Sequence, residues 1–263
     1  MAVLGVVAEV YPQFFLTISQ TWVPPMDGNI CIHVIGGGGG AAGNGGTAGG
    51  AGGYCKKNSL AVTTGGSFVV VVGARGIGGY GQNSGSAAGA STVAGTGLSA
   101  TLTANGGSFG NFTSGGNGAG GTAANGDVNN TGGAGNSSGG GAVGVYGTGA
   151  TTSGGHLYGA QTDAGSSDAG LANSSYGVIT GGLAGVGNSG TDANNGANNA
   201  TRWAGDLSGG AYINSMSSAV HNVGGSATVG GGGGGVSRGA TVSYFAMGGN
   251  GGCGLVLIQY LPW

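Results

Sequence analysis

The stretch from residue 29 to residue 40 reads NICIHVIGGGGG and places a β-strand directly before a run of glycines. Over residues 30–35 the side chains alternate along the chain with the period of a strand. Glycine has no side chain to bury and loses much conformational freedom when it is ordered. The sequence therefore predicts a strand that leads into a segment of a different kind. One face of the strand would carry Ile30, Ile32 and Val34, and the other would carry Cys31, His33 and Ile35.

The other end of the chain has the same two parts in the opposite order. Residues 248–254 read GGNGGCG and are followed by LVLIQY at 255–260, a continuous apolar run typical of a buried strand. Such a strand at this end indicates a folded domain rather than a disordered tail. We expect it to pair with the strand at 30–35.

Further strands are predicted between these ends. Residues 60–64 and 68–72 are rich in β-formers and are separated by Gly65-Gly66, a pattern typical of a β-hairpin. Residues 98–102 read LSATL and alternate with period two, which predicts another short strand.

The amino-acid composition excludes several classes of protein. Glycine supplies 72 of the 263 residues, charged residues make up only 5%, and the formal net charge is −2. Long helices are excluded because each internal glycine costs about 1 kcal/mol relative to alanine. Collagen is excluded by only 4 prolines and no strict Gly-X-Y period. A nucleic-acid partner would need clustered basic residues, and insertion across a membrane would need a longer apolar run.

Glycine-rich blocks fill much of the chain between residues 105 and 254, and they have two interpretations. A flexible linker is the compositional default. The alternative is polyglycine II, in which extended left-handed helices with three residues per turn hydrogen-bond to their neighbours. We favour polyglycine II, because apolar strands at both ends of a long linker would be exposed to aggregation.

The expected fold is therefore all-β and irregular, with short β-strands at both ends and a glycine-rich polyglycine II helix bundle or sandwich. We expect four parts along the chain. They are an N-terminal attachment or oligomerisation segment at 1–22, a strand and hairpin part at 23–104, the polyglycine II lattice with variable loops at 105–254, and a closing strand at 255–263.

Reactive side chains give little support for catalysis. Cys31, Cys55 and Cys253 form no CxxC pair, so we interpret them as small buried residues. A structural disulfide and a zinc site with His33 are the open alternatives. Acidic residues are scattered, and neither a nucleophile elbow nor a phosphate-loop motif is present. We expect no enzyme activity, no cofactor and no metal.

The order of these features resembles the glycine-rich domain of bacteriophage tail-fibre proteins. In that family a tryptophan–proline turn leads into an alternating strand and a glycine run, as at 22–40 here. A Gly-Gly-Tyr step, a hairpin that ends in V-x-V-G and a glycine-rich turn correspond to residues 52–54, 60–73 and 76–81. The closing glycine-rich strand of the family corresponds to residues 248–258.

The resemblance covers residues 22–260 and implies a virion protein of a tail or fibre. It is similar in style to the adhesins at long-tail-fibre tips, in which polyglycine II helices support variable receptor-binding loops. We therefore expect a non-catalytic protein that recognises a host surface protein or glycan and assembles with other virion fibre subunits. A secreted structural or ice-binding glycine-rich protein is the alternative.

Bulky residues between glycine blocks are the candidates for receptor binding, because a glycine lattice has no room for them inside. We expect them on loops distal to the attachment end, at 150–163, 194–204 and 211–223. Tryptophan, tyrosine and arginine are common anchors of binding interfaces. The candidate residues are His156, Tyr158, Arg202, Trp203, Tyr212, Met216 and His221.

The first 21 residues are apolar and have no obvious partner within a lattice of small residues. We expect them to dock onto another fibre subunit or onto copies of the same chain, and a homotrimer is the first expectation by analogy with other fibre appendages. The residues expected to dock are Val3, Val6, Val10, Phe14, Leu16 and Ile18.

Overall fold

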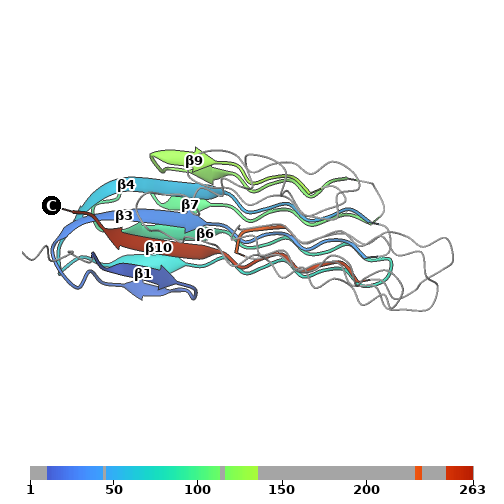
Figure 1. The fold of residues 1–263 in the computed structure, drawn as a ribbon, viewed down its shortest axis with the longest axis horizontal. Helices are drawn as coiled ribbons and strands as arrows, with labels where there is room; N and C mark the ends of the chain where they lie inside the picture. The colour runs from blue at the N-terminus through green and yellow to red at the C-terminus, as the bar shows by residue number, and fades with distance from the viewer. Residues whose placement is uncertain (1–10, 44–45, 113–115, 136–228, 233–246, 263) are drawn as a thin grey trace, which may run out of the picture.

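The computed structural model describes residues 11–43, 46–112, 116–135, 229–232 and 247–262. These residues contain no helix and form two five-stranded antiparallel sheets, which confirms the all-β part of the expectation. The sheets lie at one end of an elongated body, and extended glycine-rich segments run from them toward the other end (Figure 1).

The first sheet brings the two ends of the chain together, in the order β1-β10-β3-β4-β9. Its central pair confirms the expectation that the strands near both ends would pair, since Leu257 lies opposite His33 in the antiparallel register of β10 and β3. The strands are β1 (Gln13–Leu16), β10 (Leu255–Tyr260), β3 (Gly28–Ile35), β4 (Tyr54–Val62) and β9 (Val128–Asn130).

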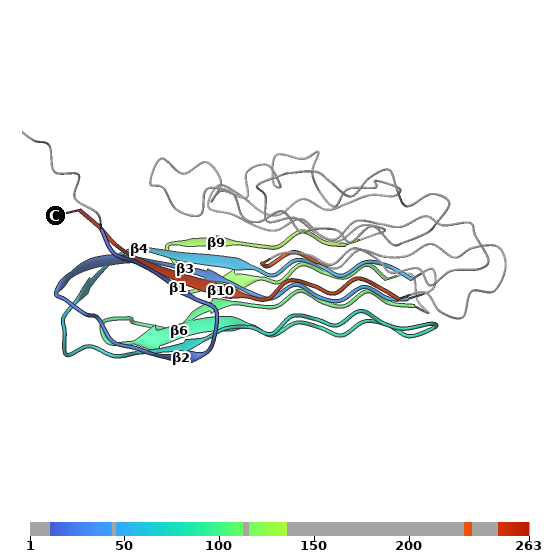
Figure 2. The ribbon, with the colours of Figure 1, turned by 60° about the horizontal axis from the view of Figure 1, so that its bottom comes forward.

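The second sheet has the order β2-β5-β6-β7-β8. It lies on the other side of the core from β3, β4 and β10 (Figure 2). Its strands have two to five residues, and none of them carries a charged residue. They are β2 (Gln20–Trp22), β5 (Phe68–Val71), β6 (Ser91–Gly95), β7 (Leu102–Ala104) and β8 (Ala123–Ala124).

The predicted hairpin around Gly65-Gly66 is wrong in its pairing. The turn exists, because the amide of Gly66 donates to the carbonyl of Thr63 at 2.8 Å. The strands on either side of it, β4 and β5, belong to different sheets. Since the inward side chains of both strands fill one core from opposite sides, the turn carries the chain from one sheet to the other.

The strand predicted at 98–102 begins later than expected, because β7 starts at Leu102. Gly97 has a φ of 83°, a left-handed conformation that favours glycine and makes a turn after β6. Leu98 is partly buried against the core as a turn residue.

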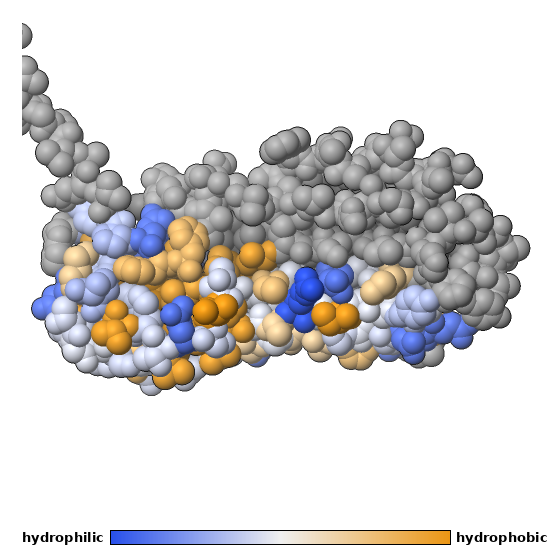
Figure 3. Space-filling model, turned by 90° about the horizontal axis from the view of Figure 1, so that it is seen from below, coloured by the Kyte–Doolittle hydropathy of each residue, from blue (hydrophilic) through white to orange (hydrophobic). Residues whose placement is uncertain are grey.

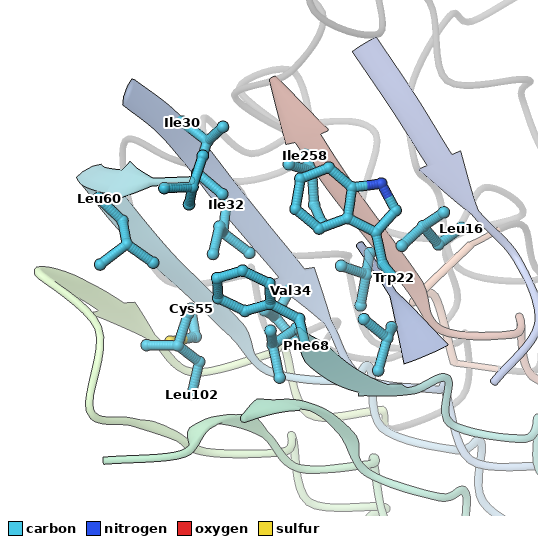
Figure 4. Packing of buried hydrophobic residues seen from close by; sticks show 14 of the residues in the cluster. Leu16, Trp22, Ile30, Ile32, Val34, Cys55, Leu60, Phe68, Leu102 and Ile258 are labelled. Atoms are coloured by element: carbon cyan, nitrogen blue, oxygen red, sulfur yellow. The ribbon is translucent and has the colours of Figure 1, made fainter. Parts of the chain in front are cut away.

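The core lies between the two sheets (Figure 4). The alternation predicted for β3 is confirmed, and the structure directs Ile30, Ile32 and Val34 into this core, where they are fully buried. The opposite face, with Cys31, His33 and Ile35, is also buried. From the other sheet Phe68 packs beside Trp22, with ring centroids 5.6 Å apart. Full burial of each such side chain contributes about 1.5–3 kcal/mol to stability, so this small core holds the sheet end together.

Part of the N-terminal segment belongs to this core. Leu16 is buried, and Phe14 packs edge-on against Trp22 with a centroid distance of 5.5 Å. We expected both residues to dock onto another subunit, and the structure corrects this, because β1 pairs with β10 of the same chain. Ile18 remains 68% exposed. Val3, Val6 and Val10 lie outside the described residues.

Beyond the sheets, the glycine-rich segments are joined by backbone hydrogen bonds with a period of three residues. In the segment at 36–43, successive amides donate in turn to three different segments, at 46–53, 83–90 and 247–254. Gly36, Gly39 and Ala42, for example, donate to the carbonyls of Gly53, Gly50 and Thr47 at 2.8–3.0 Å. This pattern differs from that of a β-strand, whose amides point alternately to two sides.

The segment at 36–43 lies at the centre of a ring of six others. It is hydrogen-bonded to five of them, and a Cβ built on Gly38 would overlap the carbonyl of Gly231 in the sixth. Neighbours within the ring are also hydrogen-bonded to one another. In order around the centre the ring consists of residues 46–53, 105–112, 83–90, 73–79, 247–254 and 229–232.

We call the described segments of this ring, its centre and the adjoining residues 116–122 and 131–135 the glycine bundle. We expected the glycine lattice to begin at residue 105, but the period-three hydrogen bonds already include residues 36–53 and 73–90. The reason is that strands such as β3 continue directly into a bundle segment (Figure 1).

Glycine is required inside the bundle for close approach of the backbones. A Cβ on Gly39 would overlap the carbonyl oxygen of Ser108, and one on Gly78 would overlap that of Gly248. By contrast, a Cβ on Gly65, in the turn at the sheet end, would meet nothing within 4 Å.

Candidate functional site

The receptor-binding residues expected from the sequence all lie outside the described part of the chain. They are His156, Tyr158, Arg202, Trp203, Tyr212, Met216 and His221. The structure describes two other places where polar or aromatic side chains gather. One is buried in the first sheet. The other lies at the end of the glycine bundle remote from the sheets, around the turn at residues 80–83, which we call the turn end.

The buried group, which we call the His33 cluster, joins three neighbouring strands. His33 of β3 lies with Nδ1 2.6 Å from the hydroxyl of Tyr54 on β4 and Nε2 3.1 Å from Oε1 of Gln259 on β10. The Cys31 sulfur is 3.3 Å from the same Nε2 atom. All four side chains are at least 92% buried, and they lie on the face of β3 opposite the main core.

One tautomer of His33 satisfies this geometry. The Gln259 Oε1 atom can only accept, so the Nε2–H of His33 donates to it, and Nδ1 then accepts from the Tyr54 hydroxyl. The assignment follows from the hydrogen-bond partners. Both ring nitrogens of the neutral imidazole thus have hydrogen-bond partners, and these bonds link β3 to β4 and to β10.

Electrostatics also keep the His33 cluster uncharged. Burial and, to a lesser extent, the positive charge of Lys56 lower the pKa of His33 to about 4, against a smaller opposing contribution from the Gln259 hydrogen bond. Burial raises the pKa of Cys31 to about 11 and raises the pKa of Tyr54. A reactive Cys–His pair needs a thiolate stabilised by its surroundings, which is the reverse of these shifts. The His33 cluster is therefore suited to cross-linking strands rather than to nucleophilic chemistry.

The three cysteines are free thiols in separate surroundings. Cys31 belongs to the His33 cluster, Cys55 lies in the main core, and Cys253 is exposed. Within the described ranges, no three His, Cys, Asp or Glu side chains gather as metal ligands would.

A second polar contact fixes the approach to β9. Lys57 Nζ lies 2.8 Å from Asp127 Oδ1, and the amide of Asn58 donates to Asp127 Oδ2 at 2.8 Å. The hydrogen bond from Lys57 is the main cause of the lowered pKa of Asp127. The pair is exposed, and such pairs contribute at most about 1 kcal/mol, so it is a local support for the strand.

The turn end of the bundle lies remote from the sheets (Figure 1). There the amide and side-chain nitrogen of Asn83 both donate to the carbonyl of Tyr80, and Gly81 has a φ of 60°. The ring of Tyr80 is 48% exposed. Nearby, the Ser84 hydroxyl accepts from the amide of Phe112 at 3.1 Å.

This turn end places an aromatic residue on the surface at a position that the sequence analysis did not select. Tyr80 is followed by Gly81 and preceded by glycines. A bulky residue flanked by glycines is the sequence pattern that could have identified Tyr80 as a surface residue. The described chain ends lie at the opposite, sheet end, where Tyr260 donates its amide to Pro12.

The glycine content, the two sheets and the period-three bundle can now be compared with known families. A family described as a glycine-rich domain matches residues 16–261. The chain belongs to this glycine-rich domain family. The match includes the whole described bundle and both sheets except the first three residues of β1, which agrees with a single architecture over this range. No curated protein matches the sequence.

None of the residues that the structure describes forms a helix with the length and hydrophobicity needed to cross a bilayer.

Proposed function

We propose that the protein is a bacteriophage fibre or adhesin component that recognises a host cell-surface receptor through loops on a rigid glycine scaffold. The scaffold in this proposal is a polyglycine II lattice. The observation that carries the proposal is the ring of six segments around residues 36–43, joined by backbone hydrogen bonds of period three.

The hydrogen-bond pattern supports polyglycine II in particular. A helix with three residues per turn directs every third amide to the same neighbour, as Gly36, Gly39 and Ala42 do. Neighbours in the bundle run in both directions, since residues 46–53 are antiparallel to 36–43 while residues 105–112 are parallel to it. Both arrangements are possible because the hydrogen bonds leave each helix in three directions.

Such a scaffold suits recognition because its stability depends on its backbone. Connecting loops at the turn end can then vary in sequence while the bundle keeps its structure. The exposed ring of Tyr80 is an example of a large side chain presented there. In the proposal the loops at 150–163, 194–204 and 211–223 are presented in the same way, with Arg202, Trp203 and Tyr212 as the main anchors.

The proposal places the protein in the tail or fibre of a virion, with other fibre subunits and further copies of the same chain as partners. The sheet end would be the attachment end, because the described chain ends lie there. No catalytic step, cofactor or nucleic acid is part of the proposal.

Adsorption of particles to host cells tests the recognition step. Particles that carry Arg202→Ala, Trp203→Ala or Tyr212→Ala should adsorb more than tenfold more slowly, since about 1.4 kcal/mol corresponds to tenfold in affinity. Phe15→Ala is the matched control, because this aromatic ring is 51% exposed at the sheet end. Unchanged adsorption of all three variants, with normal incorporation into particles, would contradict recognition through these residues.

A further inference from the structure

The outer face of the second sheet forms a surface without charge. Alternation along each strand directs Thr21, Val69 and Ala94 outward in one row across β2, β5 and β6. A second row crosses β5, β6, β7 and β8. It consists of Val71, Thr92, Thr103 and Ala124.

The apolar part of this face continues along the bundle. Val69 and Val71 are 56% and 40% exposed on β5. The chain then enters the bundle segment at 73–79, where Ala74 and Ile77 are exposed at a spacing of three residues. We call these four residues the β5 stripe. Hydrophobic residues are visible both over the sheets and farther along the bundle on the side seen in Figure 3.

A surface of this kind is unusual for a free monomer. Exposed sheet faces of soluble proteins usually carry polar or charged side chains, whereas the second sheet has no charged residue in any strand. Arg75 is the charge within the segment that carries Ala74 and Ile77. Exposed apolar side chains beside an uncharged sheet face are a feature of interaction sites.

We propose that the β5 stripe and the outer face of the second sheet pack against a second copy of this chain. The lack of charge in the strands of this sheet argues for such a partner. A strongly acidic or basic partner would lose hydration of its charges without gaining an opposite charge. A copy of the chain is itself charge-poor, with 5 basic and 7 acidic residues in 263. Two sheets with short side chains can also approach closely, as sheets do in sandwiches.

The direction of the stripe agrees with a side-by-side arrangement. It runs from a strand into the bundle segment that follows it, and both lie along the long axis of the described body (Figure 1). A contact along this line would join copies lengthwise, as in a fibre. The inference rests on the homo-oligomer of the proposed function and names the surface through which the copies associate. Its test measures the mass of the assembly, whereas the test of the proposed function measures adsorption to host cells.

The test is sedimentation of the full chain and its variants over a range of concentrations. The wild type should self-associate, and Val69→Lys combined with Ile77→Lys should weaken association at least tenfold. Phe15→Lys is the matched control, since Phe15 is 51% exposed on β1 of the first sheet, and it should associate like the wild type. Thermal unfolding of each variant checks that the fold is kept.

A mixture provides a second measurement. Chains with Val69→Lys and Ile77→Lys should regain association when mixed with chains that carry Val69→Asp and Ile77→Asp, because unlike charges would then face each other. A monomeric wild type, or folded lysine variants that associate normally, would overturn the proposal. A monomeric wild type that inhibits ice growth, with loss of inhibition in the lysine variant, would overturn it and assign the surface to ice instead.

Discussion

The backbone amide of Gly39 donates to the carbonyl of Gly50 at 2.8 Å, three residues after Gly36 donates to Gly53. Between these two bonds, the amides of Gly37 and Gly38 turn to two other segments. No side chain takes part in this relationship. The bundle should therefore be destabilised when a Cβ is added at a close-packed glycine. Exchanging one exposed side chain for another should matter less.

Gly39→Ala should therefore destabilise the protein strongly. The added Cβ would overlap the carbonyl oxygen of Ser108, so the segments would separate and several hydrogen bonds would weaken. At about 0.5–1.5 kcal/mol for each bond, the free energy of unfolding should fall by roughly 2 kcal/mol or more. Denaturant unfolding measures this change.

Gly65→Ala is the matched control for that substitution, because a Cβ at Gly65 meets no atom within 4 Å. Its stability should be equal to the wild type or about 0.4–1 kcal/mol higher, through reduced freedom of the unfolded chain. Equal effects of the two substitutions would contradict a close-packed bundle.

Stability should depend on the protonation of His33. Its pKa of about 4 in the folded protein lies below the ordinary histidine value of 6.5, so the unfolded chain binds the proton more readily between these values. The contribution of neutral His33 is therefore complete above pH 6.5 and is lost as pH falls toward 4. The shift corresponds to about 3 kcal/mol. Urea unfolding at several pH values should show this slope, and His33→Gln should reduce it. A slope that is identical in the variant would assign it to other groups.

Tyr54→Phe should destabilise the first sheet through the same cluster. The substitution removes the donor to His33 Nδ1 and leaves a buried acceptor unpaired, which costs about 1–3 kcal/mol. Tyr260→Phe is the comparison, because its hydroxyl donates to the carbonyl of Met26 in a part-buried site that water can replace. Thermal unfolding should rank Tyr54→Phe as the more damaging, and the opposite order would argue against a structural role for the cluster.

Asp127→Asn should have little effect on stability. The Lys57–Asp127 pair is exposed on both sides, and such pairs are worth at most about 1 kcal/mol and are screened by salt. The small loss should decrease further at high salt concentration in denaturant titrations. A loss well above this limit would mean that the contact with the Asn58 amide controls the position of β9.

Several parts of the fold could be predicted from the sequence because local patterns determine them. The alternation over Ile30, Ile32 and Val34 identified the strand and the residues that share a face, and the apolar run at 255–260 coincides with β10. The placement of β4 and β5 in different sheets could not be predicted, because a glycine turn fits a hairpin as well as a crossing between sheets. Which sheet each strand joins depends on the strands from other parts of the chain that pair with it.

The His33 cluster was beyond prediction for a different reason. Gln259 is 226 residues away from His33 in sequence and reaches it only through the pairing of β3 and β10. The ring of six segments is a similar case. Its composition was visible in the sequence, but the order of neighbours around residues 36–43 follows from the strand order of the two sheets.

The alignment of the glycine segments with the long axis has a mechanical consequence. Their hydrogen bonds run across that axis, so a load applied from the sheet end to the turn end acts on them in shear. Bonds loaded in this way share the force and must break together, whereas a load from the side would open them one after another. The bundle is thus strongest in the direction in which a tethered rod is pulled.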